Sequence, residues 1–211
     1  MRLYGAIIVA FLVALTSGPA SAQPIRIVAF GDSLLAGFGL RANESFPAQL
    51  EIALKKRGHE VEIVNAGVSG DTTSGGVSRL DWSIADGTQA VILVLGANDM
   101  LRGMEPELAR KNLDEMIRRL KARKIEVLIG GMRAAPNLGA DYAAKFDSIY
   151  AGLAKEHDVL IYPFFLDGVA GQRELNMNDG IHPTPKGVSL IVERIMPSVE
   201  SLIERVKKRR G

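Results

Sequence analysis

The stretch IRIVAFGDSLL, residues 25–35, is the clearest indication of how this chain folds. Its first six residues are mostly apolar, and the run ends abruptly at Gly31, Asp32 and Ser33. Further short apolar runs follow, separated by longer amphipathic segments; they span residues 61–65, 90–95, 126–129 and 159–162. Near-continuous apolar runs of this length are typical of parallel strands that are buried on both faces. The sequence therefore predicts a five-stranded parallel sheet.

The segments between these runs have the amphipathic spacing of helices. We expect helices over residues 45–57, 74–84, 106–123, 140–157 and 185–208. Gly58 ends the first of them, and Pro106 stands in the first turn of the third, where its missing N–H is tolerated. A regular alternation of strand and helix predicts a single doubly wound α/β domain, with helices on both faces of the sheet.

The first 22 residues have the features of a secretory signal peptide. Arg2 supplies a positive start, residues 6–15 are apolar, and Ala20-Ser21-Ala22 is a small-x-small cleavage site. The apolar run is shorter than the roughly 20 residues that a membrane span needs. We therefore predict a signal peptide over residues 1–22, one domain over residues 23–211, and export to the periplasm or the medium. The chain has no cysteine, so we expect no lipid anchor.

Length and composition narrow the class of protein. The chain has 211 residues, of which 47% are hydrophobic, enough for one sizeable core. Its net charge of +2 is too balanced to suggest a nucleic-acid partner, and no basic stripe is interleaved with aromatic residues. We interpret the basic run at residues 207–210 as a solvated helix end. The oligomeric state is left open by the sequence.

Polar residues and a glycine follow the predicted strands at the points where those strands end. Ser33 follows the first strand, Gly70 the second and Asn98 the third, while Asp179 and His182 lie in the loop after the fifth. In an open parallel sheet the carboxyl ends of the strands share one edge, and ligands bind outside it. We therefore expect all five residues at the same edge of the sheet.

His182 is the candidate general base among the three histidines of the chain. Asp179 lies three residues upstream in a loop, where its carboxylate can fold back and hold the imidazole in one tautomer. His59 precedes the second strand and His157 precedes the fifth, which places both at the opposite edge. We interpret those two as surface or helix-end histidines.

Ser33 is the candidate nucleophile, because a serine that attacks a carbonyl needs a base, and the base needs an orienting carboxylate. The alternative is that Ser33 caps a helix, as serine often does. Asp179 and His182 could also form half of a metal site, but no cysteine, second histidine or tight carboxylate cluster accompanies them at that edge. We predict a Ser33–His182–Asp179 triad and no metal.

Three groups at this edge can donate hydrogen bonds to a tetrahedral oxyanion: the Asn98 amide, the Gly70 N–H and the Ser33 N–H. The alternatives are that Asn98 is a turn residue that bonds only local backbone, and that Gly70 belongs to a flexible loop or to a phosphate-binding loop, although the spacing matches no phosphate-binding motif. Aspartates beside these residues are expected to accept loop-fixing hydrogen bonds: Asp32, Asp71 and Asp99.

Apolar residues gather in the loops after the third and fourth strands: Met100, Leu101, Met104, Met132, Ala134, Ala135, Pro136 and Leu138. At a ligand-binding edge such residues indicate a groove for an acyl chain. We expect Leu101 and Leu138 to contact the substrate there. The alternative is that the whole set packs beneath the loops as a satellite of the core.

The blocks Gly31–Leu34, Gly70, Gly96–Asp99 and Asp179–Pro183 occur in an order that resembles the SGNH (GDSL) hydrolase family. The resemblance runs over nearly the whole mature chain, and it is closest to the exported bacterial thioesterase I, lysophospholipase and arylesterase subfamily. One departure is Ala97, where the family has a second glycine. A methyl group is tolerated there if the backbone suits an L-residue.

The resemblance implies a flavodoxin-like three-layer sandwich around a five-stranded parallel sheet. It implies a serine esterase or thioesterase in which Ser33 attacks the acyl carbonyl, His182 takes its proton, and Asp179 orients His182. The substrate would be a small-molecule acyl ester or thioester, such as an aryl ester or a lysophospholipid, and no metal or organic cofactor would be needed. Two other functions stay open: a carbohydrate O-deacetylase with a more polar groove, and a non-catalytic binding module on the same fold.

Overall fold

A computed structural model describes residues 23–210 of the chain. The predicted signal peptide, residues 1–22, lies outside the described residues. Within the described residues, no helix has both the length and the apolar composition that crossing a membrane requires.

The sheet has five parallel strands, as the apolar runs predicted. They are β1 (Ile25–Gly31), β2 (Val61–Gly67), β3 (Ala90–Val94), β4 (Glu126–Gly130) and β5 (Leu160–Tyr162). Their order in the sheet is β2-β1-β3-β4-β5, which is the flavodoxin-like order. In the register of the sheet, Ile27 of β1 lies opposite Ile63 of β2 and Ala90 of β3. The predicted fold class is confirmed.

The long helices also lie where the amphipathic spacing predicted them. They are α2 (Phe46–Lys56), α3 (Thr73–Ser83), α5 (Pro106–Ala122), α6 (Ala140–His157) and α7 (Pro185–Arg210). The structure adds short elements that the sequence pattern did not reveal: α1 (Ser33–Ala36), α4 (Ala97–Leu101), and the 3₁₀ turns η1 (Ala42–Glu44) and η2 (Pro136–Leu138). These short elements lie at the carboxyl edge of the sheet or close to it.

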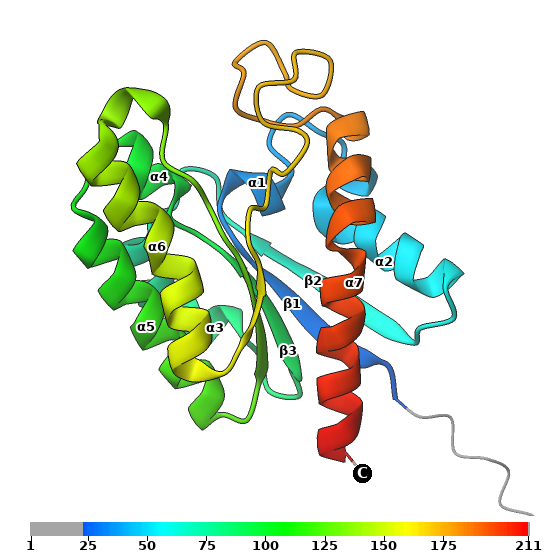
Figure 1. The fold of residues 1–211 in the computed structure, drawn as a ribbon. Coiled ribbons are helices and arrows are strands. Elements are labelled where there is room, and N and C mark those ends of the chain that lie inside the picture. Colours follow the sequence, from blue (N-terminus) through cyan, green and yellow to red (C-terminus); the bar gives the residue numbers. More distant parts are fainter. Residues whose placement is uncertain (1–22, 211) are drawn as a thin grey trace, which may run out of the picture.

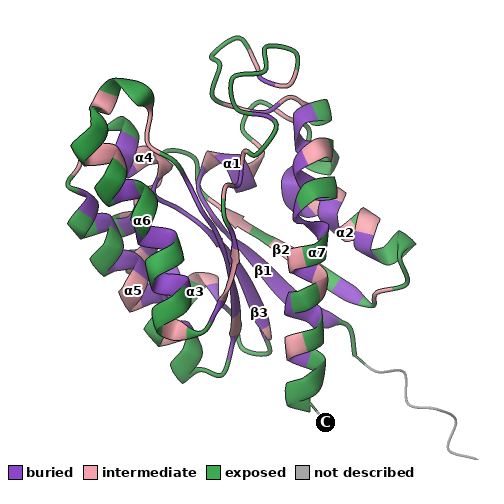
Figure 2. Ribbon diagram, in the orientation of Figure 1, coloured by how far each residue is buried: buried purple, intermediate pink, exposed green. Residues whose placement is uncertain are grey.

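Helices cover both faces of the sheet (Figure 1). Helices α2 and α7 pack against each other on one face, and α3, α5 and α6 pack side by side on the other. The central strands are therefore buried on both sides, and Figure 2 shows them almost wholly in the colour of buried residues. Every residue of β3 is buried, because its apolar side chains point alternately into the two helical layers.

The chain changes direction across the sheet between β1 and β3. After β1 it passes through α2 to β2 on one side, and after β2 it passes through α3 to β3 on the other. The segments that leave β1 and β3 thus turn toward opposite faces and part from each other at the carboxyl edge. Such a switch point is where open α/β sheets bind their ligands.

Candidate active site

Ser33 is the first residue of α1, directly beyond the carboxyl end of β1. The N-cap of this helix is Asp32, whose side chain accepts a hydrogen bond from the Leu34 N–H at 3.0 Å. The short helix packs close to β2, since a side chain at Gly67 would overlap the backbone of Ala36. The capping role is therefore filled by Asp32, and the hydroxyl of Ser33 is free to face the loop that carries His182.

The imidazole of His182 lies between Ser33 and Asp179. Its Nε2 atom is 2.9 Å from Ser33 Oγ, and its Nδ1 atom is 2.7 Å from Asp179 Oδ2. The other oxygen of Asp179 accepts the backbone N–H groups of Ile181 and His182 at 2.9 and 3.0 Å. Hydrogen bonds from the backbone and ring of His182, and from Ile181, lower the pKa of Asp179 to about 2. An ionised Asp179 holds a proton on Nδ1, so Nε2 presents its lone pair to Ser33.

Phe38 is a neighbour of the imidazole that sequence reasoning missed. Its ring lies against that of His182, with centroids 4.5 Å apart and an angle of 35° between the planes. The chain reaches this position through Gly37, which has a left-handed backbone with φ of 81°. Phe38 is half exposed, and no periodic pattern marks it in the sequence. Its position depends on a loop contact between residues far apart in the chain.

The other two histidines lie at the amino edge of the sheet, as predicted. Each is partly buried and paired with a carboxylate: His157 with Asp114 at 2.7 Å, and His59 with Glu200 at 3.2 Å. The interpretation as helix-end residues is confirmed, since His157 is the last residue of α6 and His59 follows the end of α2. Each fastens a helix end to a neighbouring helix.

Among residues 23–210, the side chains whose ligand atoms converge closely enough for a metal ion are Asp114, Glu156 and His157. Both carboxylates already pair with arginines, Asp114 with Arg118 at 2.9 Å and Glu156 with Arg110 at 2.6 Å. This group lies at the edge of the sheet opposite Ser33. Its charges are balanced by protein side chains without an ion.

Asn98 lies in α4, and its amide nitrogen contacts residues outside that helix. Nδ2 donates to the carbonyl oxygen of Asp71 at 2.9 Å and lies 3.4 Å from Oδ2 of Asp32. Asn98 is therefore not a turn residue that bonds only local backbone. Ala97, which precedes it, is the first residue of the helix and does not have a positive φ, so the methyl group is accommodated.

Two backbone N–H groups at this edge, those of Ser33 and Gly70, donate to no acceptor within residues 23–210. Gly70 has a left-handed backbone with φ of 80°, which a residue with a side chain adopts only at a cost. The turn around Gly70 closes through a hydrogen bond from the Asp71 N–H to the Val68 carbonyl at 3.1 Å. Each of these N–H groups belongs to a residue next in the chain to one that the Asn98 amide contacts: Ser33 follows Asp32, and Gly70 precedes Asp71.

The three neighbouring aspartates accept hydrogen bonds within the loops, as predicted. Asp99 accepts the N–H and the hydroxyl of Thr73 at 2.8 and 2.6 Å, which ties α4 to the start of α3. Asp71 accepts from Arg79 at 2.6 Å. Asp32 is buried, and the loss of hydration raises its pKa to about 6, although the Leu34 N–H opposes that shift.

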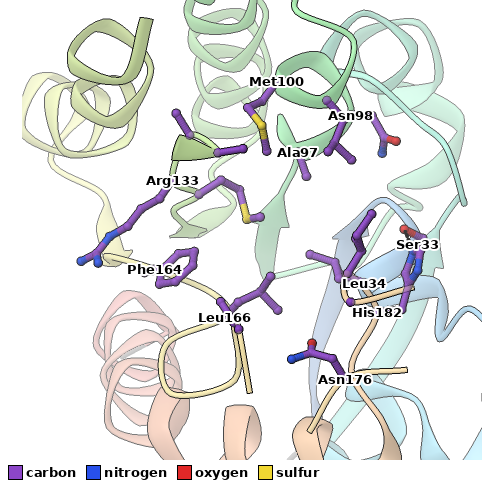
Figure 3. A pocket seen from close by; sticks show the side chains of 18 of the residues that line it. Ser33, Leu34, Ala97, Asn98, Met100, Arg133, Phe164, Leu166, Asn176 and His182 are labelled. Carbon is purple, nitrogen blue, oxygen red and sulfur yellow. Dashed lines mark hydrogen bonds between the residues drawn. The ribbon is translucent and has the colours of Figure 1, made fainter. Parts of the chain in front are cut away.

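A cavity of about 370 Å³ opens beside Ser33 and His182. Figure 3 shows Ser33, Leu34 and His182 at one end of it, with Phe164 and Arg133 at the other. Apart from those five residues, its lining is mostly small or apolar: Ala97, Met100, Leu101, Met132, Ala134, Ala135, Pro136, Leu166, Ala170, Gly171, Gly180 and Ile181, with Asn98 and Asn176 as polar members. Most of the predicted apolar loop residues thus face one cavity.

Leu138 corrects part of that prediction, because it does not line the cavity. It ends the 3₁₀ turn η2, is partly buried, and packs against the hydrophobic core. Met104, from the same predicted set, is also absent from the lining. The far wall comes instead from the long loop that follows β5, through Phe164 and Leu166. Sequence reasoning missed this wall, because the loop has no periodic pattern.

Comparisons with known proteins agree with this arrangement. The profile of the GDSL-like lipase/acylhydrolase family matches residues 29–190. Esterase TesA of Pseudomonas aeruginosa is 36% identical over 193 residues, 91% of this chain and 94% of that protein. The thioesterase 1/protease 1/lysophospholipase L1 of Escherichia coli K12 is 35% identical over 194 residues, 92% and 91% of the two chains. The solved structure of AlinE4, described as an SGNH-hydrolase family esterase, has a TM-score of 0.73 and 45% identity, and the match covers 86% of this chain and 98% of that one.

Proposed function

Since the chain belongs to the GDSL-like lipase/acylhydrolase family and is a hydrolase of acyl esters, we propose that Ser33, His182 and Asp179 carry out its reaction. The observation that carries the proposal is the unbroken series of hydrogen bonds from Ser33 Oγ through the imidazole to Asp179, at the mouth of the cavity. This arrangement supports acyl transfer through a covalent acyl-enzyme.

In the first half of the reaction, Ser33 Oγ attacks the acyl carbonyl carbon while Nε2 of His182 takes the hydroxyl proton. The resulting imidazolium is stabilised by the ionised Asp179 and then gives its proton to the departing alcohol or thiol. In the second half, water replaces that leaving group, gives a proton to Nε2, and attacks the acyl-enzyme. The proton returns to Ser33 as the carboxylic acid leaves.

In this proposal the N–H groups of Ser33 and Gly70 and the amide of Asn98 hold the oxyanion. The two N–H groups have no acceptor within the described residues, so the protein does not compete with the substrate for them. One proton of the Asn98 amide is used by the Asp71 carbonyl, while the other makes only a long contact of 3.4 Å with Asp32. Donors oriented in this way favour the tetrahedral state over the planar ester.

The largely apolar cavity supports an aliphatic or aryl acyl group as the part of the substrate that it binds. Leu101 lines it and is also half exposed, so it can contact a bound chain near the entrance. A sugar ring would find few hydrogen-bonding partners among these side chains, and the proposal therefore favours esters and thioesters of apolar acids over a carbohydrate O-deacetylase. We also propose that residues 1–22 direct export, on the sequence features described above.

The proposal is tested with p-nitrophenyl esters from acetyl to palmitoyl and with a fluorophosphonate probe, on wild type and on Ser33→Ala. Ser33→Ala is expected to lose turnover and labelling together while its circular dichroism spectrum stays that of the wild type. Labelling that persists in Ser33→Ala would place the nucleophile elsewhere. A correctly folded wild type that turns over none of these esters would refute the proposed substrate class.

A further inference from the structure

Arg79 is a buried arginine that the proposed reaction does not use. It belongs to α3, and only 8% of its side chain is exposed. Its guanidinium carbon lies 3.9 Å from the centroid of the Phe30 ring in β1. Burial of a charged side chain is costly unless it is paired and fully hydrogen-bonded. The hydrogen bonds of Arg79 must therefore offset the cost of burying its charge at the carboxyl edge of the sheet.

The guanidinium joins three separate segments of that edge. Nε donates to Asp71 Oδ2 at 2.6 Å, Nη1 to the Ala66 carbonyl at 2.8 Å, and Nη2 to the Gly31 carbonyl at 2.8 Å. Gly31 lies two residues before Ser33, and Asp71 comes directly after Gly70. One planar, rigid group thus holds the end of β1, the end of β2 and the loop beyond β2 in a fixed relation.

Asp71 also links these segments to α4. Its carbonyl accepts the amide of Asn98 at 2.9 Å, and its N–H closes the turn around Gly70. Its carboxylate fits closely against α3, because a side chain at Gly75 would overlap it. Each of the three proposed oxyanion donors therefore lies on a segment that Arg79 holds directly or through Asp71.

We propose that Arg79 is a positioning residue of the oxyanion hole, acting through Asp71 and the Gly31 carbonyl on donors that it does not touch. The inference rests on the proposed function, since it needs an oxyanion to be stabilised. Donors of this kind are effective only if their geometry is set before the reaction begins. A lysine at this position can keep the ion pair with Asp71, but its single ammonium cannot hold the same set of carbonyls.

The test begins with the steady-state kinetics of Arg79→Lys on a p-nitrophenyl ester. We expect kcat to fall by about tenfold or more and KM to change by less than about threefold, because the donors act mainly in the transition state. Arg119→Ala is the matched control. Arg119 also donates to a carbonyl of α3, that of Val77 at 3.1 Å, but it reaches none of the catalytic loops. Its loss should lower the melting temperature and leave kcat within about twofold.

A double-mutant cycle with Asn98→Ala separates positioning from general stability. If Arg79 orients Asn98, then the factor by which Arg79→Lys lowers kcat should be at least about threefold smaller in the Asn98→Ala background than in wild type. Losses that multiply independently in the cycle, or a wild-type kcat in Arg79→Lys, would overturn the inference. Should Arg79→Lys fail to fold, Asp71→Asn takes its place in the cycle under the same criteria, since it keeps the carbonyl and the side-chain size.

Failure of this inference is distinguishable from failure of the proposed function. If Ser33→Ala still turns over ester, the proposed function is wrong whatever the cycle shows. If turnover depends on Ser33 but the losses of the cycle are independent, only the role of Arg79 is wrong.

Discussion

His182 and His157 each place a ring nitrogen 2.7 Å from an aspartate oxygen, one at each edge of the sheet. At the carboxyl edge the second nitrogen of His182 faces Ser33, and the ring borders an open cavity. At the amino edge, Asp114 also binds Arg118, and His157 ends α6 with most of its side chain covered. The same hydrogen bond therefore serves chemistry in one place and helix packing in the other.

The difference between the two edges shows that a histidine–carboxylate pair does not by itself indicate a catalytic site. At the carboxyl edge the second ring nitrogen faces the Ser33 hydroxyl, two N–H groups have no acceptor in the described part of the chain, and the imidazole lines a cavity. Parallel strands deliver these features together, because the loops that leave their carboxyl ends diverge at the switch point. The amino edge also has a cavity, lined by Lys121, Asp158 and Arg205 among others, but the ring of His157 does not line it.

The largest expected difference between the edges is in activity. His182→Ala should lower kcat/KM by about 10⁴-fold or more, because His182 is the base that hydrogen-bonds the Ser33 hydroxyl within residues 23–210. His157→Ala should leave kcat/KM within about twofold at temperatures where the variant is folded, and should lower the melting temperature. Ester hydrolysis and thermal unfolding, measured on both variants, check this. Comparable losses of activity in the two variants would mean that the two histidines do not differ in function.

A second expected effect concerns the donors that only the carboxyl edge has. Asn98→Ala should reduce kcat by roughly 100- to 1,000-fold with a smaller change in KM, since its amide stabilises charge that develops in the transition state. Steady-state kinetics on a single ester suffices. A raised KM with an unchanged kcat would make Asn98 a substrate-binding residue instead.

The pH dependence of stability should have opposite signs for aspartates at the two edges. Asp32 has a pKa raised to about 6 by burial, so between about pH 4 and pH 6 the native state binds more protons than the unfolded state, and stability falls as pH rises. In Asp32→Asn, the decrease in the free energy of unfolding over this pH range should be smaller by up to about 3 kcal/mol. Urea unfolding at pH 4.5 and pH 7.5 measures it; equal differences between variant and wild type at the two pH values would contradict it.

Asp114 provides the opposite case at the amino edge. Burial tends to raise its pKa, but hydrogen bonds from Arg118 and His157 prevail and hold it below the usual value. Its contribution to stability is therefore present above about pH 4 and is lost as the pH falls further. Asp114→Asn should weaken the fold at neutral pH and should differ less from wild type in strong acid.

The smallest expected effect concerns the cavity at the carboxyl edge and the contact of Leu101 with an acyl chain. Leu101→Asp should reduce kcat/KM for an octanoyl ester about tenfold more than for an acetyl ester, because each buried methylene contributes up to about 0.8 kcal/mol. Leu108→Asp is the control, since Leu108 is also exposed but lies on α5 outside the cavity. Equal losses on the two esters would mean that the acyl chain does not lie against Leu101.

Residue patterns alone were sufficient to predict the arrangement of strands and helices in this protein. Apolar runs such as Ile25–Phe30 are short and continuous because their strands are buried on both faces, and that property is local enough to be seen in the sequence. The alternation with helices makes the strands parallel, and parallel strands bring the residues at their carboxyl ends to one edge. For that reason the shared position of Ser33, Asn98 and His182 could be predicted before any contact was known.

Only the tertiary structure decided what surrounds these residues. Phe38 lies on His182, Phe164 closes the far wall of the cavity, and Leu138 packs into the core instead of the groove. Arg79 joins the ends of two strands to the loop beyond β2. Each of these placements is a contact between segments far apart in the chain, made by loops whose course depends on packing, and no hydrophobic period in the sequence records it.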